Sequence, residues 1–312
     1  TVPTAVSALM QRPVDADVSK VKNAFSGSAP MPLELFNRFT KSTGIQIIER
    51  YGLTEATVLV SINPVDGGKR VGSVGLPFPS NDVKIIAQKG DGPVECAPDE
   101  IGEICVAGPG VYAGNTYTEA DKNVDLYYHD KYLRTGDLGR IDPEGYIWIT
   151  GRAKDLIIRG GHNIDPAEIE DALLTHQDVA FAGAIGQPDA HSGELPCAYV
   201  ELVAGATATA DDLMAHAKKH IHERAAIPKH VEVLVELPKT AVGKVFKPDL
   251  RKSAITRVYN AALEEAGVSA RVTSVVDDKK RGLVAQLTAN SATEEEVSQV
   301  LGSFVRPWEW TS

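Results

Sequence analysis

The chain has 312 residues, 43% hydrophobic and 24% charged, which is typical of a soluble globular protein with two domains rather than one. Its formal net charge of −10 and isoelectric point near 5.3 argue against nucleic acids and anionic membrane surfaces as main partners. No apolar run approaches the roughly 18 residues that a spanning helix needs, so we expect a cytoplasmic protein without a transmembrane segment.

The chain begins with Thr1 rather than Met, so we expect it to be the carboxy-terminal part of a longer protein. Its three cysteines, Cys96, Cys105 and Cys197, lack the spacing of metal ligands. An odd number of cysteines suits reduced thiols in a cytosolic enzyme, and we expect each to be a small buried hydrophobic residue rather than a nucleophile.

Residues 18–44 predict a strand, a loop and a helix, because an alternating apolar segment is followed by Gly27-Ser28-Ala29-Pro30 and then by a helical repeat that Pro32 opens. A short strand at 45–48 leads into Tyr51-Gly52. Residues 71–150 alternate in short segments rich in β-branched residues, glycine and proline, which favours a small twisted barrel or sheet.

A turn at 142–145 joins predicted strands at 138–141 and 146–150. A strand at 155–159 then ends at Gly160-Gly161. Asp165 is expected to cap a helix that has Pro166 at its first position, with Glu168 completing a capping box. The following segments predict a compact α+β domain: strands at 179–185, 196–203 and 231–235, and a helix at 210–224.

The last sixty or so residues predict a helix at 248–266, a hairpin at 271–288 and a helix that opens at Thr293. They have no functional interpretation. His216 and His220 are spaced as a possible metal pair on the helix at 210–224, but no Glu or Cys completes a site, so solvated side chains are the better interpretation.

Three motifs carry a resemblance to a known family. They are YGLTEAT at 51–57, TGDLGRIDPEGYIWITGRAKDLIIRGGHNIDPAEIE at 135–170 and LPKTAVGKVFK at 237–247. Together they resemble the adenylate-forming (ANL) superfamily of acyl-CoA synthetases, peptide-synthetase adenylation domains and luciferases, over about residues 24–250. The resemblance implies that ATP activates a carboxylate as an acyl-adenylate, with release of pyrophosphate, and that coenzyme A then displaces AMP.

The resemblance also implies a mixed α/β fold of the α+β type and a particular division into domains. Residues 1–151 would be the C-terminal part of the large AMP-binding domain, with a β-barrel-like subdomain at about 71–150. Residues 152–155 would form a hinge, 156–250 a small mobile α+β domain, and 251–312 an extra helix–hairpin–helix tail.

The first group of site residues that the resemblance implies binds the nucleotide. Tyr51 offers an aromatic face for adenine, and Gly52 allows close approach of the backbone. Thr54 would bond the phosphate, and Glu55 would hold Mg²⁺, a hard cation that prefers oxygen ligands. Without the other motifs, Glu55 would only be a solvated carboxylate at the start of a helix.

The loop of Ser28, Ala29 and Pro30 would form the other wall of the adenine site, although most such loops are only turns. Asp137 would accept hydrogen bonds from both ribose hydroxyls, and Arg152 would reach ribose or phosphate oxygens. The alternatives are that Asp137 caps a local turn and that Arg152 is a surface residue at a domain junction.

The second group belongs to the small domain. Lys154 holds the family's hinge position. Lys244 would be the adenylation lysine, a mobile charge that bridges the acyl carboxylate and the α-phosphate. Gly160, Gly161 and His162 would line the passage for the pantetheine arm of coenzyme A, unless the glycines only form a turn.

Within the family, GGHNIDPAEIE and PKTAVGKVFK are more similar to acyl-CoA synthetases of the fatty-acid ligase type than to adenylation domains that load a carrier protein. The family's glycine-rich phosphate loop is absent and would lie upstream of Thr1, so we expect the chain by itself to be inactive. The alternative from another class is a non-catalytic interaction module. The acyl substrate and the oligomeric state are not readable from the sequence.

Overall fold

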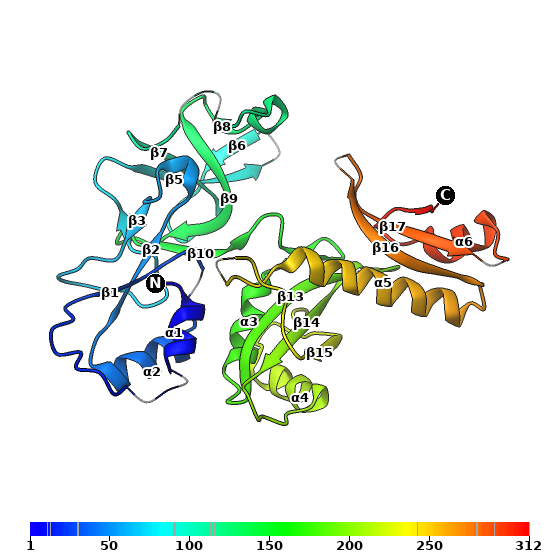
Figure 1. Ribbon diagram of the computed structural model, residues 1–312. Helices are drawn as coiled ribbons and strands as arrows, with labels where there is room; N and C mark the ends of the chain where they lie inside the picture. The colour runs from blue at the N-terminus through cyan, green and yellow to red at the C-terminus, as the bar shows by residue number, and fades with distance from the viewer. Residues whose placement is uncertain are drawn as a thin grey trace. The chain divides into compact units, whose positions relative to one another are not determined.

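The computed structural model describes residues 1–311 except 11, 13, 30, 90, 91, 113, 115, 242, 279 and 290. The chain divides into two compact units, Thr1–Lys154 and Asp155–Ser312, which we call unit 1 and unit 2. Figure 1 labels the helices and many of the strands of each unit. Both units mix helices and sheets, so the predicted mixed α/β class is confirmed.

The first sheet of unit 1 has four strands, in the order β1 (Ala24–Ser26), β2 (Ile47–Tyr51), β3 (Ser61–Ile62) and β4 (Leu76–Pro77). Strands β1 and β2 are parallel, and the other neighbours are antiparallel. Helices α1 (Pro3–Met10) and α2 (Leu33–Thr43) share one apolar core with β2. The predicted strand, loop and helix are therefore confirmed, and α2 ends at Gly44, which adopts a left-handed φ of 73°.

The second sheet of unit 1 is antiparallel and has six strands, in the order β10-β9-β7-β5-β6 with β8 paired to β9. Their bounds are β5 (Asp82–Lys89), β6 (Gly92–Glu95), β7 (Gly102–Ala107), β8 (Tyr127–Tyr128), β9 (Tyr132–Ile141) and β10 (Ile147–Arg152). The sheet curls strongly (Figure 1), and over the described residues β10 and β6 do not pair with each other. The barrel-like subdomain is thus an open half-barrel.

Two short 3₁₀ turns, η1 (Thr54–Ala56) and η2 (Ala120–Asn123), complete unit 1. The apolar core under the curled sheet includes Tyr51, Ala56 and Val60 from the segment around η1. The half-barrel therefore fixes the position of the first motif.

The main sheet of unit 2 has five strands, in the order β12-β11-β14-β13 with β15 parallel to β14. Their bounds are β11 (Ile157–Arg159), β12 (His162–Ile164), β13 (Val179–Asp189), β14 (Gly193–Leu202) and β15 (His230–Leu234). Successive side chains of a strand point to opposite faces. Ala184, Ala198 and Val200 accordingly share a core with α3 (Pro166–Leu174) and α4 (Ala210–His220).

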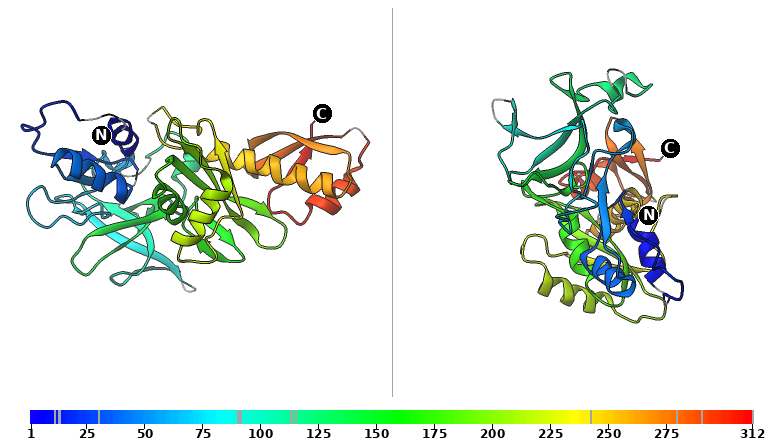
Figure 2. Two further views of the ribbon diagram at one scale, coloured as in Figure 1. Left: turned by 90° about the horizontal axis from the view of Figure 1, so that it is seen from below. Right: turned by 90° about the vertical axis from the view of Figure 1, so that its left-hand side faces the viewer.

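The opposite face of β13 and β14 packs against helix α5 (Lys247–Glu265) through Ile185, Cys197 and Tyr199. The C-terminal half of α5 covers the three-stranded sheet β16-β17-β18 and contributes Ile255, Tyr259 and Leu263 to its core. Figure 2 shows α5 running along both parts of unit 2. The bounds of the last elements are β16 (Ala270–Asp278), β17 (Gly282–Ala289), α6 (Glu294–Leu301) and β18 (Trp308–Trp310).

The structure corrects several local predictions. Helix α4 ends at His220 rather than at 224, because Ile221 turns extended and is buried with only 6% exposed. Asp165 caps α3 as predicted, but its side chain accepts from the backbone N–H of Ala167 and no capping box with Glu168 forms; the carboxylate of Glu168 accepts from the backbone N–H of Glu223 instead. The expected tail boundary at residue 251 falls inside α5.

The C-terminal elements follow the predicted pattern with one addition. The hairpin β16–β17 and the helix that opens at Thr293 are confirmed, and Thr293 forms a capping box with Glu296. Strand β18 was not predicted, since three residues carry little local signal and its partner β17 is distant in sequence.

Candidate active site

Asp137 and Arg152 are direct neighbours across the antiparallel pair β9–β10. The register of this pair shifts at a bulge between Ile149 and Gly151. A shift of one residue would turn the following side chains to the other face of the sheet. Arg152 Nε donates to Asp137 Oδ1 over 2.6 Å, with the carboxylate buried and the guanidinium 63% exposed.

The other oxygen of Asp137 is held by the first motif. Tyr51 Oη donates to Asp137 Oδ2 over 2.6 Å, although the two residues are 86 positions apart. A carboxylate has about four lone-pair sites, so each oxygen keeps capacity for a further donor. The contact makes Asp137 more than a local turn cap, because it joins two motifs that the sequence separates.

The ring of Tyr51, which was expected to offer an aromatic face for adenine, is buried. Only 8% of the residue is exposed, and it lies in the core of the half-barrel. Burial and the neighbouring Asp137 carboxylate raise the pKa of the Tyr51 phenol above its usual range, so the phenol is a donor. In this arrangement the ring presents no open face to adenine.

Gly52 is required by its own loop. A Cβ atom on Gly52 would lie 1.3 Å from the carbonyl oxygen of Val58, so a side chain is excluded by the protein's backbone. Thr57 and Val58 have left-handed φ angles of 50° and 78°, which are uncommon for β-branched residues. Thr54 is exposed and Glu55 half-buried on η1, at the start of this strained turn.

The loop after β1 lies at the end of the first sheet. Ser28 is exposed with a left-handed φ of 70°, and Ala29 is half-buried. Pro30 lies outside the described residues. Gly27 is buried, and a Cβ there would meet Arg50 at 3.0 Å, so this glycine serves packing against the strand that leads to Tyr51.

Sequence reasoning missed two polar residues near these loops. Glu49 on β2 is 7% exposed and accepts a hydrogen bond of 2.9 Å from the backbone N–H of Gly72. Burial raises the pKa of Glu49 to about 7. Tyr117 donates from Oη to Glu55 Oε1, across 62 positions in sequence. Neither contact has a local sequence signal.

In unit 2, Gly160 and Gly161 form the two-residue turn between β11 and β12. Their φ angles of 58° and 84° are both positive, as a type I′ hairpin turn requires. A Cβ on either glycine would meet no atom within 4 Å, so space does not exclude a side chain in unit 2 alone. His162 follows the turn and is in contact with Glu223 through Nε2.

The backbone of Lys244 is hydrogen-bonded to Thr240. Its carbonyl accepts from Thr240 N–H over 2.7 Å, and its own N–H donates to Thr240 Oγ1 over 3.1 Å. Gly243 has the positive φ of 80° that the tight turn needs. Lys239 Nζ anchors the loop to Glu201 at 2.5 Å, and Lys244 is exposed.

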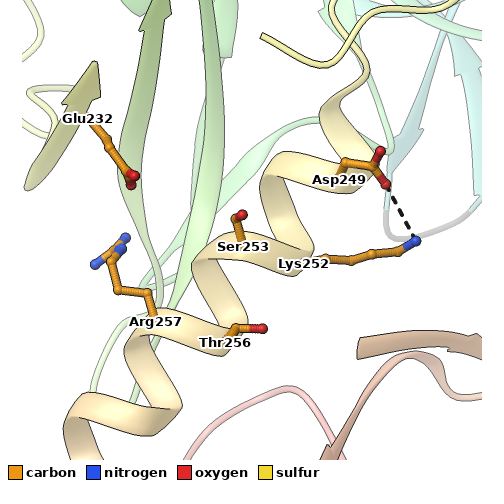
Figure 3. Close-up of a pocket in the computed structure, with 6 residues that line it drawn as sticks. All are labelled: Glu232, Asp249, Lys252, Ser253, Thr256 and Arg257. Carbon is orange, nitrogen blue, oxygen red and sulfur yellow. Dashed lines mark hydrogen bonds and ion pairs between the residues drawn. The ribbon is translucent and has the colours of Figure 1, made fainter. Parts of the chain in front are cut away.

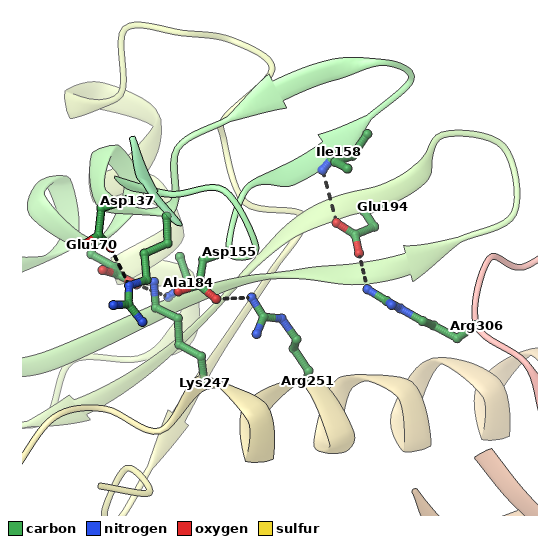
Figure 4. A network of polar contacts seen from close by, with 10 residues as sticks. Asp137, Asp155, Ile158, Glu170, Ala184, Glu194, Lys247, Arg251 and Arg306 are labelled. Carbon is green, nitrogen blue, oxygen red and sulfur yellow. Dashed lines mark hydrogen bonds and ion pairs between the residues drawn. The ribbon is translucent and has the colours of Figure 1, made fainter. Parts of the chain in front are cut away.

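Lys154 is exposed and is the last residue of unit 1. The next residue, Asp155, accepts from Arg251 of α5 over 2.7 Å within unit 2 (Figure 4). Lys247 Nζ and Glu170 Oε1 form an ion pair of 2.8 Å, which is also drawn in Figure 4. Polar contacts therefore fix the start of unit 2 immediately after the expected hinge.

The described residues form no metal cluster, and a pocket of unit 2 lies away from the motifs. No group of three or more His, Cys, Asp or Glu residues among them could hold a metal ion. One polar pocket of unit 2 lies between β15 and α5 (Figure 3), and none of the motif residues lines it. Its lining residues are Glu232, Asp249, Lys252, Ser253, Thr256 and Arg257.

The cysteines agree with the expectation of buried thiols only in part. Cys105 and Cys197 are fully buried, and burial raises the pKa of each thiol to about 12. Cys96 is half-buried.

No helix in the described parts of the chain is both long enough and apolar enough to cross a membrane.

Two family models and several curated proteins match this chain in sequence. A model described as AMP-binding enzyme matches residues 1–115, and a model described as AMP-binding enzyme C-terminal domain matches residues 168–244. Marinolic acid–CoA ligase of Pseudoalteromonas sp. (strain SANK 73390) is 40% identical over 303 residues, covering 96% of this chain and 46% of the relative. Long-chain-fatty-acid–CoA ligase of Bacillus subtilis (strain 168) is 40% identical over 231 residues, covering 74% and 40%.

Solved structures of other proteins also resemble this chain. ATP-bound MatB from Rhodopseudomonas palustris has a TM-score of 0.73 and 33% identity, covering 80% of this chain and 49% of that chain. The anthranilate CoA ligase AuaEII in complex with anthranoyl-AMP has a TM-score of 0.74 and 26% identity, covering 83% and 50%. The chain spans about half the length of the curated relatives it matches.

Proposed function

The chain belongs to the family of AMP-binding enzymes, and from that membership we propose that the whole protein is an acyl-CoA synthetase. It would join a carboxylic acid to ATP as an acyl-adenylate, release pyrophosphate, and transfer the acyl group to coenzyme A with release of AMP. A fatty acid is the proposed substrate class, in line with the long-chain-fatty-acid–CoA ligase relative.

The observation that carries the proposal is the contact of Tyr51 and Arg152 with the two oxygens of Asp137. It supports a ribose site in which a fixed carboxylate accepts from two adjacent hydroxyls. Tyr51 would take part through its phenol, which orients Asp137. Stacking of its ring on adenine stays a prediction, and it requires the ring to become uncovered.

The remaining nucleotide contacts are proposals for exposed or half-buried groups of unit 1. Ser28, Ala29 and Pro30 would wall the adenine site, Gly52 would lie close to the nucleotide, and Thr54 would bond a phosphate. Glu55 fits a Mg²⁺ ligand, because this ion is usually held by one or two carboxylates together with substrate phosphates and water. Bound Mg²⁺ would neutralise phosphate charge.

Unit 2 would supply the groups that differ between the two half-reactions. Lys244 would stabilise the charge that develops between carboxylate and α-phosphate, and hydrogen bonds from its backbone to Thr240 support its position. Gly160, Gly161 and His162 would line the pantetheine passage. Rotation at Lys154 would let one small domain serve both steps.

The test uses the full-length protein and carboxylate-dependent ATP–pyrophosphate exchange. Lys244→Ala should lower exchange by about 100-fold or more, the usual effect of removing a group that stabilises a transition-state charge. It should spare thioester formation from supplied acyl-adenylate. Lys252→Ala, a matched loss of charge on α5, should leave both steps unchanged.

Three outcomes separate the alternatives. Equal loss of both steps in Lys244→Ala would refute the assigned role of this lysine. Exchange with acyl transfer to a carrier protein instead of coenzyme A would indicate a carrier-loading adenylation enzyme. Absence of exchange with every carboxylate in a broad screen would favour a non-catalytic interaction module.

A further inference from the structure

A loop of the half-barrel is fastened to the turn that carries Glu55. The N–H of Tyr112 donates to the carbonyl of Glu55 over 3.0 Å, and the hydroxyl of Thr57 donates to the carbonyl of Gly110. The third contact is the hydrogen bond from the Tyr117 phenol to Glu55 Oε1. The loop therefore touches backbone and side chain of the same short turn.

The backbone of Tyr117 is held in place by the side chain of Asn123. Its N–H donates to Asn123 Oδ1 over 2.9 Å, and its carbonyl accepts from Asn123 Nδ2 over 2.7 Å. The adjacent Thr116 hydroxyl shares a hydrogen bond of 2.7 Å with Tyr127 Oη. A residue fixed at both backbone groups can hold its side chain at one position with little loss of entropy on binding.

The direction of the phenol hydrogen bond follows from the charges. The oxygens of a carboxylate only accept, so the phenol hydroxyl of Tyr117 is the donor to Glu55 Oε1. Glu55 Oε1 is thereby occupied, whereas Oε2 accepts no hydrogen bond from the described residues. One oxygen is left for a cation.

The turn after η1 has a strained backbone, so we expect it to move if its contacts with the loop of Tyr117 are removed. Thr57 and Val58, directly after η1, have left-handed φ angles of 50° and 78°. Such backbone conformations in β-branched residues persist only where surrounding contacts hold them. Glu55 would then sample other rotamers and lose its fixed direction.

We propose that Tyr117 is a positioning residue that fixes the Glu55 carboxylate for one-oxygen coordination of Mg²⁺ in the nucleotide site. The proposal rests on the proposed function, because it takes Glu55 to be the Mg²⁺ ligand. It assigns to Tyr117 no contact with substrate.

The test is Tyr117→Phe in the full-length protein, which removes only the phenol hydroxyl. A hydrogen bond to a charged group contributes enough that the Mg²⁺ concentration for half-maximal pyrophosphate exchange should rise about tenfold. The rate at saturating Mg²⁺ should stay near that of the wild type. Calorimetric titration of ATP at several Mg²⁺ concentrations gives a readout independent of turnover and should shift in the same way.

Tyr112→Phe is the matched control, because Tyr112 lies in the same loop, is 57% exposed and contacts Glu55 through its backbone N–H. It should leave the Mg²⁺ requirement unchanged. Asn123→Ala releases the backbone of Tyr117 and should raise the requirement in the same direction. In a double variant with Tyr117→Phe, Asn123→Ala should raise the Mg²⁺ requirement only slightly further.

An unchanged Mg²⁺ requirement in Tyr117→Phe would overturn the proposal. A rate lowered equally at all Mg²⁺ concentrations would also overturn it, since that pattern indicates a general structural defect. Absence of Mg²⁺-dependent exchange in the wild type would instead refute the proposed function, so the two failures are distinguishable.

Discussion

Glu49 provides a pH-dependent test of the unit 1 fold. Its side chain is buried on β2, beside Ser26 in the register of the parallel pair β1–β2, and it accepts from Gly72 N–H. Burial raises its pKa from 4.5 to about 7, because the charged form loses solvation. Glu49→Gln keeps an oxygen acceptor for Gly72 but cannot ionise.

The sign and size of the effect follow from linkage. The folded state binds the proton more tightly than the unfolded chain, so Glu49 makes stability highest below pH 4.5 and lowers it as pH rises toward 7. Each pKa unit corresponds to about 1.4 kcal/mol. Between pH 5 and pH 8 the wild type should therefore lose about 2.5 kcal/mol relative to Glu49→Gln.

The assay is urea unfolding of unit 1, followed by the fluorescence of Trp148 in a background where Trp308 and Trp310 are replaced by Phe. Glu119→Gln serves as the control, because Glu119 is exposed and its pKa is lowered to about 2, chiefly by a hydrogen bond from Lys122. It stays ionised from pH 5 to pH 8 and should give a flat difference. A flat difference for Glu49→Gln would refute the burial argument.

Two further predictions concern the proposed site. Asp137→Ala in the full-length protein should weaken ATP binding by roughly 1.5–3 kcal/mol, the range for hydrogen bonds to a charged acceptor, and an unchanged affinity by calorimetry would remove Asp137 from the ribose site. Gly161→Asn should leave the thermal stability nearly unchanged, because Asn tolerates a left-handed φ, yet it should slow thioester formation while sparing pyrophosphate exchange. Gly161→Leu is a poorer probe, since the strain of its positive φ is added to any block of the passage, and normal coenzyme A consumption by the Asn variant would contradict that passage.

Much of the local structure was predictable because its causes lie within a few residues. Proline and glycine gave the turn at 142–145, where Gly145 has a φ of 90°. Asp165 and Thr293 each cap the helix that follows them. Helix α4 was predicted too long, because the burial of Ile221 in the core overrides the helical preference of the sequence around it.

The motifs of the candidate site could be predicted from the sequence, but the spatial contacts between their side chains could not. The motif residues Asp137, Glu55 and Lys244 were found from sequence, but the partner of each carboxylate was not. Tyr51 was expected to offer an aromatic face for adenine, and only the structure shows that it lies in the half-barrel core with its phenol donating to Asp137.

The sequence by itself therefore determined the order of elements, the turns and caps, and the family to which the motifs point. Only the tertiary structure decided which side chains meet: the bulge between Ile149 and Gly151 that sets Arg152 opposite Asp137, the link from Tyr117 to Glu55, and the buried carboxyl of Glu49. The physical reason is that turns and caps are governed by neighbouring dihedral angles, whereas strand register and burial depend on contacts between residues far apart in the chain.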